Sequence, residues 1–161
     1  PQEAWQNLVA SVPTADLTDP LASFARRILG DNPDVALRAT RAWLNYERAL
    51  MGEAPLTALP DASQLAKARI QMHYLTRHCF LAPGQLVAGI ERIRHIPAVI
   101  VQGMADSICP PQVAEKVRHA WPEATWVPVA GAGHGALSPP IARACIKALG
   151  WMAESMHGYV D

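Results

Sequence analysis

The chain has 161 residues, which is long enough for one domain with a sizeable core. Hydrophobic residues make up 50% of the sequence and charged residues 17%, a composition typical of a globular chain and not of a disordered one. Lys+Arg and Asp+Glu are both 14, so the formal net charge is zero. Because there is no basic surplus and no Lys/Arg run, the sequence predicts no nucleic-acid partner.

Targeting and metal-binding patterns are also missing from the sequence. No apolar stretch approaches the roughly 20 residues of a membrane helix, and the start does not read as a signal peptide. We therefore expect a soluble, cytoplasmic protein with no membrane partner. The first residue is Pro1 and not Met, which indicates a processed or partial chain. The three cysteines show no CxxC spacing and the six histidines no HExxH or HxH cluster, so we expect neither a disulfide framework nor a metal.

Helix signals dominate the sequence up to about residue 95. Asp19-Pro20 is typical of an N-cap followed by proline in the first turn, and Gly30 ends that helix. Asn32-Pro33 opens a second helix. Further helices are expected over residues 62–77 and roughly 84–93, after a proline-containing loop. In the second helix the apolar residues that share one face are Val35, Ala39, Ala42, Trp43, Tyr46 and Leu50.

The rest of the chain alternates strand and helix signals. Residues 96–103, "IPAVIVQG", form a continuous apolar run that predicts a strand buried on both faces. A helix to about residue 120 follows Pro110-Pro111, and residues 124–131 predict a second strand. Pro128 cannot donate to a ladder and favours a sheet edge. A final helix over 139–157 completes the order strand, helix, strand, helix, which indicates an α/β fold with a parallel sheet.

Two parallel strands leave much of a sheet uncovered, and the first 95 residues offer no convincing third strand. The sequence therefore has two interpretations. It is either a mostly helical fold with a small ribbon, or the C-terminal part of a larger α/β protein. The missing initial methionine favours the second interpretation.

An acid and a histidine follow the two predicted strands. Asp106 lies three residues beyond the first strand, and His134 lies three residues beyond the glycine that ends the second. Functional groups of parallel sheets gather beyond the carboxyl ends of the strands, so both side chains are expected at one sheet edge. There Asp106 can accept a hydrogen bond from one imidazole nitrogen and support His134 as a base. This chain order matches the second and third members of an α/β-hydrolase triad.

Taken singly, each residue has a simpler interpretation. An aspartate after a strand commonly caps a turn or a helix, and a histidine in a glycine-rich loop is commonly a surface residue. The matching strand positions favour the catalytic pair. No G-x-S-x-G elbow and no HGG-like oxyanion loop occur in the sequence, however, so a serine nucleophile is expected upstream and outside this chain.

Several stretches resemble the C-terminal half of proline iminopeptidase, a family of α/β-hydrolases that remove N-terminal proline from peptides. These stretches are "NPDVALRATRAWLNYE", "IERIRHIPAVIVQGMADSICP" and "AWPEATWVPVAGAGH". The resemblance implies a mostly helical cap over residues 1–90 and the C-terminal part of the hydrolase core over 91–161. It further implies that Asp106 is the triad acid and His134 the general base, with no metal or organic cofactor.

The same resemblance assigns substrate binding to the cap. Glu47 matches the family position whose glutamate binds the free amino group of the substrate, by a charge-assisted hydrogen bond. Without the resemblance, the sequence predicts that Glu47 is a solvated helix residue paired with Arg48 or with a lysine elsewhere. Gln71, in "RIQMHYL", stands where the family has a second glutamate. Because a neutral amide still accepts a hydrogen bond but carries no charge, amine binding is expected to be weaker.

The acid's surroundings also depart from the family. "QGMAD" replaces the usual "HGRYD", which changes the neighbours of Asp106 and bears on the preference for proline over other small residues. Cys109 matches a family cysteine beside the site, so alkylation at this residue is expected to slow hydrolysis by the full enzyme.

The sequence thus predicts the C-terminal portion of a serine aminopeptidase that acts on peptides with a free N-terminal proline or similar small residue. This portion is expected to be inactive alone and to need the N-terminal half of the hydrolase domain as its partner. Two alternatives stay open. One is a non-catalytic or truncated relative that binds a peptide or partner, and the other is a different α/β-hydrolase such as an esterase.

Overall fold

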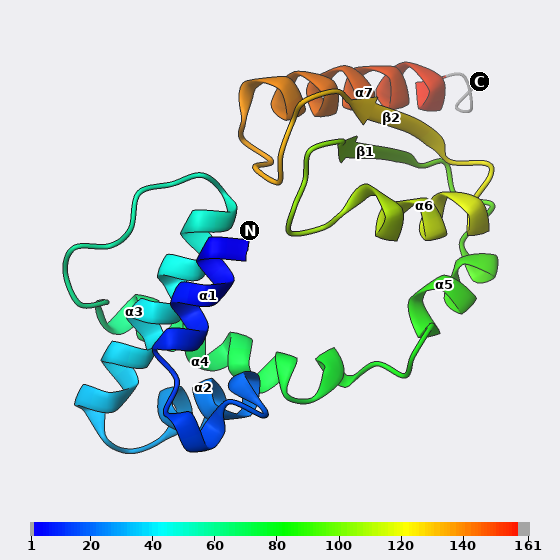
Figure 1. Cartoon of the computed structure of the whole chain (residues 1–161). Helices are drawn as coiled ribbons and strands as arrows, with labels where there is room; N and C mark the ends of the chain where they lie inside the picture. Colours follow the sequence, from blue (N-terminus) through cyan, green and yellow to red (C-terminus); the bar gives the residue numbers. More distant parts are fainter. Residues whose placement is uncertain (1, 158–161) are drawn as a thin grey trace. The chain divides into compact units, whose positions relative to one another are not determined.

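A computed structural model describes residues 2–157, and the chain divides into two compact units, Pro1–Ala82 and Pro83–Asp161 (Figure 1). All the secondary structure described in the first unit is helical, whereas the second unit combines helices with a parallel sheet. The assignment of residues 1–90 to a cap and 91–161 to a hydrolase core stays a prediction.

Four α-helices build the first unit. The helices expected after Asp19, after Asn32 and over residues 62–77 are present. N-caps explain where the first two begin, because the side chain of Asp19 accepts from the Ala22 amide at 3.0 Å and that of Asn32 from the Val35 amide at 3.2 Å. The first helix was not predicted. The helices are α1 (Gln2–Ala10), α2 (Pro20–Leu29), α3 (Pro33–Leu50) and α4 (Ala62–Leu75), with 3₁₀ turns at Thr14–Asp16 and His78–Phe80.

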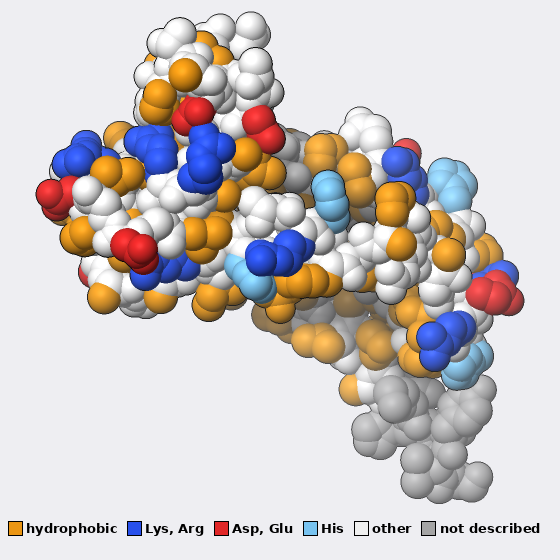
Figure 2. Space-filling view, turned by 90° about the horizontal axis from the view of Figure 1, so that it is seen from below, with side chains coloured by type: hydrophobic (Ala, Val, Ile, Leu, Met, Phe, Trp, Pro, Cys, Tyr) orange, Lys and Arg blue, Asp and Glu red, His pale blue; other side chains and the backbone are white. Residues whose placement is uncertain are grey.

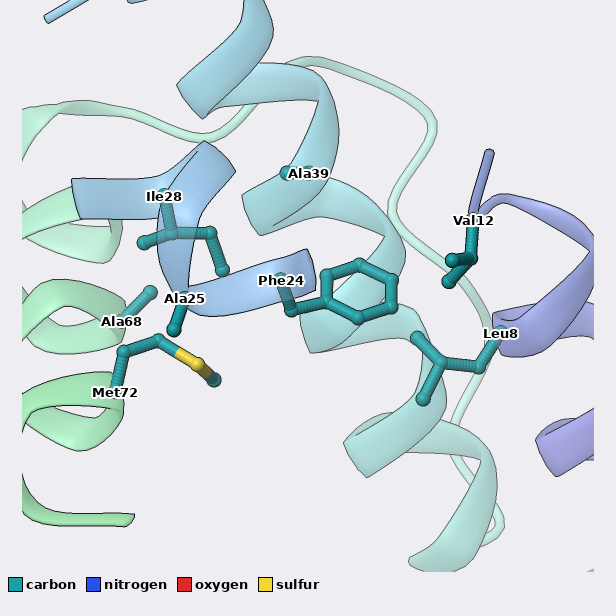
Figure 3. Close-up of a cluster of buried hydrophobic side chains, with 8 residues drawn as sticks. All are labelled: Leu8, Val12, Phe24, Ala25, Ile28, Ala39, Ala68 and Met72. Carbon is teal, nitrogen blue, oxygen red and sulfur yellow. The ribbon is translucent and has the colours of Figure 1, made fainter. Parts of the chain in front are cut away.

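The core of this unit lies where the four helices meet. Phe24 and Ile28 of α2 and Met72 of α4 are fully buried there. Figure 3 shows the Phe24 ring with Leu8 and Val12 on one side and Ala68 and Met72 of α4 on the other. The complete cluster is Leu8, Val12, Phe24, Ala25, Ile28, Ala39, Ala68 and Met72.

The predicted apolar face of α3 packs against this core through Ala39, which is buried, and through Trp43 and Tyr46, which are partly buried. The helix also buries Ala36, Thr40 and Leu44. These three residues recur every four positions and form a second stripe that periodicity alone did not single out. The helix α3 is therefore enclosed over more of its circumference than expected.

The second unit contains α5 (Gln85–Gly89), a 3₁₀ turn (Ile90–Arg92), β1 (Val99–Gly103), α6 (Pro111–Ala120), β2 (Thr125–Val129) and α7 (Pro139–His157). The strands pair in parallel, with Val99 opposite Thr125 and Gly103 opposite Val129. The helix α6 packs against β1, and α7 packs against both strands. The order strand, helix, strand, helix confirms the predicted α/β organisation of this half.

Burial of the strands differs from the expectation. Residues 99–101 are only half-buried, and within β1 only Gln102 and Gly103 are buried. The reason is that the sheet has two strands within the part of the chain that the structure describes, so each strand keeps one unpaired edge. Pro128 lies on such an edge strand, opposite Gln102, as its missing N–H requires.

The surface carries mixed charge. On the face shown in Figure 2, Lys and Arg side chains are spread among Asp, Glu and apolar side chains. Among the described residues, no helix combines the length and the apolar character that a bilayer crossing requires.

Truncation of the first unit's core tests the packing. Met72→Ala is expected to lower the free energy of unfolding by about 2–5 kcal/mol, since it removes a fully buried side chain and leaves a cavity. The matched control is Met51→Ala, because Met51 is 45% exposed. Urea denaturation followed by circular dichroism measures both. Equal losses for the two variants would contradict the assigned core.

Candidate active site

Two loops beyond the carboxyl ends of the strands meet in the second unit. The acid loop, residues 104–110, joins β1 to α6, and the histidine loop, residues 130–138, joins β2 to α7. Backbone bonds connect them: the amide of Ala105 donates to the carbonyl of Ala132 at 2.8 Å, and the amide of Met104 donates to that of Val129 at 3.0 Å. The two loops thus continue the pairing of the strands that precede them.

Gly103 permits this close approach. A Cβ atom at this position would lie 2.5 Å from the carbonyl oxygen of Gly133 and 2.6 Å from that of Ala132. Both obstacles are backbone atoms that cannot move aside as a flexible side chain can. A residue without a side chain is therefore needed where the acid loop passes the histidine loop.

The structure brings Asp106 and His134 together. Nδ1 of His134 and Oδ2 of Asp106 are 3.0 Å apart, across 28 residues of sequence. The Asp106 side chain is only 7% exposed, whereas that of His134 is 40% exposed. The carboxylate is therefore held inside the unit, and the imidazole is reachable from solvent while one of its nitrogens is fixed by the acid.

The other carboxylate oxygen of Asp106 is held by its own loop. Oδ1 accepts from the amides of Ile108 at 2.9 Å and Cys109 at 2.8 Å. Burial favours the neutral carboxyl and by itself would raise its pKa, but the Cys109 amide, the His134 ring and the Ile108 amide all favour the anion. Together these bonds lower the pKa of Asp106 below its ordinary value of 3.8.

The sequence motif of a serine nucleophile does not accompany this pair, since no G-x-S-x-G elbow occurs in the 161 residues. Cys109 is an exposed free thiol that contributes its backbone amide to Asp106. Within residues 2–157, no three His, Cys, Asp or Glu side chains are grouped as metal ligands would be.

Glu47 and Gln71 meet in the first unit, on α3 and α4. The side-chain amide of Gln71 donates to Oε1 of Glu47, and its carbonyl oxygen accepts from the indole N–H of Trp43 at 3.0 Å. Because an indole N–H can only donate, Trp43 fixes which end of the amide faces Glu47. The alternative pairing with Arg48 does not occur: Arg48 binds Glu53 instead, at 3.0 Å.

Three residues of these sites were not predicted to have the roles that the structure shows. Trp43 was predicted only as part of an apolar helix face, although its indole N–H orients Gln71 from 28 residues away. Gly103 was predicted only as the end of a strand. Gln102 was noted as a departure from the family pattern, but its contacts with the acid loop depend on a turn that residue spacing does not reveal.

Comparisons with known proteins agree with the fold. The family described as TAP-like protein, of the α/β-hydrolase type, matches residues 66–149. The chain is 35% identical over 143 residues to the proline iminopeptidase of Xylella fastidiosa, covering 85% of this chain and 46% of the relative. It is 34% identical to the proline iminopeptidases of Xanthomonas citri, over 152 residues, and Neisseria gonorrhoeae, over 149, covering 91% of this chain and 49% and 48% of theirs.

The chain therefore spans about half the length of the curated relatives it matches. Its helices, its small parallel sheet and the two loops beyond that sheet agree with the C-terminal part of an α/β-hydrolase fold. Since the family match covers more than half of the residues, the chain belongs to the TAP-like family of α/β-hydrolases and resembles the C-terminal half of proline iminopeptidases.

Proposed function

We propose that this chain is the acid–base and substrate-binding portion of a serine aminopeptidase that releases N-terminal proline, or a similar small residue, from peptides. The observation that supports it most is the hydrogen bond between Asp106 and His134 beyond two parallel strands. Relatives named proline iminopeptidase supply the substrate class. The nucleophilic serine is expected from a segment outside these 161 residues.

In the proposed reaction His134 moves a proton twice. Its Nδ1 is bound to Asp106, so Nε2 is the nitrogen that accepts the proton of the serine hydroxyl as the serine oxygen attacks the carbonyl carbon of the N-terminal residue. The C–N bond then breaks, and the proton passes from Nε2 to the leaving amine. Water hydrolyses the acyl-enzyme ester by the same proton path.

Asp106 serves this cycle as a fixed anion. The carboxylate keeps Nδ1 of His134 protonated and stabilises the imidazolium that forms when Nε2 takes up a proton. Its lowered pKa means that the carboxylate is ionised at neutral pH. The loop amides bind Oδ1, and the imidazole binds Oδ2.

Glu47 is the proposed partner of the substrate's cationic amine. Gln71 occupies Oε1 of this carboxylate, and Oε2 has no partner among the described residues. Gln71 therefore orients Glu47 by donating to it, with Trp43 as its anchor, and adds no charge to the site. A single carboxylate balances the single positive charge of an N-terminal amine.

The second unit offers a surface for the proposed N-terminal half of the hydrolase. A groove of about 330 Å³ runs between one face of the sheet and α7. The strand β1, whose residues 99–101 are half-buried, also has an unpaired edge within the described part of the chain. The missing half is the occupant that we propose, because the relatives are about twice as long as the stretch they share with this chain. The groove is lined by Val99, Thr125, Val127, Ala144, Lys147, Ala148 and Trp151.

Residues 1–161 alone are expected to show no measurable hydrolysis of proline 4-nitroanilide, because they contain neither a G-x-S-x-G nucleophile nor an HGG-like oxyanion loop. Joining or mixing them with the N-terminal half of a related proline iminopeptidase is expected to give turnover. That turnover should fall by orders of magnitude in His134→Ala, whereas His119→Ala, an exposed histidine on α6, serves as the matched control. Turnover by the chain alone that His134→Ala abolishes would overturn the proposed division. Peptide binding without turnover in the joined protein would favour the binding-module alternative.

Removal of the carboxylate at position 47 tests the amine site in the same joined protein. Glu47→Gln is expected to raise KM for proline 4-nitroanilide roughly tenfold, because it removes a charge-assisted hydrogen bond. Hydrolysis of 4-nitrophenyl acetate, which has no amine, should change less than twofold. Glu53→Gln is the matched control, since Glu53 is paired with Arg48. Equal effects on both substrates would argue against an amine site at Glu47, and hydrolysis of the ester without hydrolysis of the proline substrate would favour an esterase.

The lowered pKa of Asp106 predicts a pH dependence of stability with a defined sign. Its ionised form stabilises the folded state above pH 3.8, and this contribution is lost as the pH falls through the lower folded-state value. Asp106→Asn should lack this part of the acid-induced loss. Urea denaturation at several pH values between about 2 and 6 measures it, with Asp34→Asn, an exposed residue of α3, as the control. Identical pH profiles for Asp106→Asn and the parent would contradict the prediction.

A further inference from the structure

Gln102 is a buried amide directly beside the acid loop. It is the fourth residue of β1 and is only 8% exposed. A buried side-chain amide is costly unless its polar atoms are bonded. Its nitrogen donates to the carbonyl of Gly103 at 2.9 Å and to that of Cys109 at 3.1 Å. These two carbonyls belong to the residues at the start and near the end of the turn that carries Asp106.

Both accepting residues also hold Asp106 through other backbone atoms. The Gly103 carbonyl accepts a hydrogen bond from the backbone amide of Asp106 at 3.3 Å and another from the side-chain amide of Gln102. The Cys109 amide binds Oδ1 of Asp106, while the Cys109 carbonyl binds Gln102. Gln102 therefore shares Gly103 and Cys109 as hydrogen-bond partners with the backbone and the carboxylate of Asp106.

We propose that Gln102 is a positioning residue that holds the acid loop in this turn. In this conformation Oδ1 of Asp106 accepts from the loop amides and Oδ2 is hydrogen-bonded to His134. The proposal rests on the function proposed above for Asp106 and His134. Glutamine suits this task for two reasons. Its amide carries two N–H donors, one for each carbonyl, and it adds no charge beside the acid–base pair.

Other side chains at position 102 would lose one or both of these hydrogen bonds. Methionine has a similar shape and no donor, so both carbonyls would lose a partner. Glutamate has two oxygens that repel the same carbonyls. Histidine in its neutral form keeps one N–H donor and can hold only one of the two carbonyls at a time. Methionine or glutamate therefore removes both hydrogen bonds to the two carbonyls, whereas histidine keeps one of them.

The test uses the isotope-labelled 161-residue chain and needs neither substrate nor serine, so its result is independent of whether the aminopeptidase proposal holds. In Gln102→Met, the amides of Ile108 and Cys109 are expected to exchange with solvent roughly tenfold faster. The carboxyl carbon of Asp106 should titrate at higher pH than in the parent, because the bonds that favour its anion are weakened. Gln102→His should give smaller changes of the same sign.

Two controls separate positioning from general stability. Gln112→Met, at an exposed site on α6, should change none of these readouts. The amide of Thr125, which donates to the Ala98 carbonyl at 2.9 Å in the strand pairing, should exchange at the parent rate in Gln102→Met. If Gln102→Met does not fold, Gln102→His alone decides. Unchanged exchange at Ile108 and Cys109, or equal acceleration at Thr125, would overturn the proposal.

Discussion

The close approach of two backbone segments at Gly103 is the constraint on which the second unit depends. There the acid loop leaves β1 within contact distance of the Ala132 and Gly133 carbonyls. A Cβ atom at position 103 would clash with both carbonyl oxygens. This approach lets the Ala105 amide bond to the histidine loop and places Asp106 beside His134. Strand register, loop contact and the acid–base bond thus form one continuous set of interactions, and a change in register would disturb all three.

The two units use side-chain amides in related ways. In the first, Gln71 lies between Trp43 and Glu47, and in the second, Gln102 lies between two backbone carbonyls that flank Asp106. In each case a neutral side chain with fixed donors directs a carboxylate without altering the charge around it. Orientation and charge are therefore set by different residues.

Much of the fold could be predicted from the sequence because its signals are local. Asp19-Pro20 and Asn32-Pro33 cap helices through bonds that span three residues, and the β-branched run before Gly103 is a strand. The helix α1 was not predicted, and the burial of β1 is limited because the sheet has two strands within residues 2–157. Placement of Asp106 beside His134 could be inferred because parallel strands end at one edge. The bonds of Trp43 and Gln102 could not, since they depend on side-chain geometry between segments that no spacing rule connects.

The acid and the base are joined through a single crossover, β1 to α6 to β2, with both partners inside one compact unit. Contacts within such a short segment form with little loss of chain entropy compared with contacts across a whole domain. A hydrolase divided between its nucleophile and this unit would therefore keep its acid–base geometry in one piece. Reunion of the parts would then have to supply the serine and the oxyanion hole to a histidine that is already oriented by its acid.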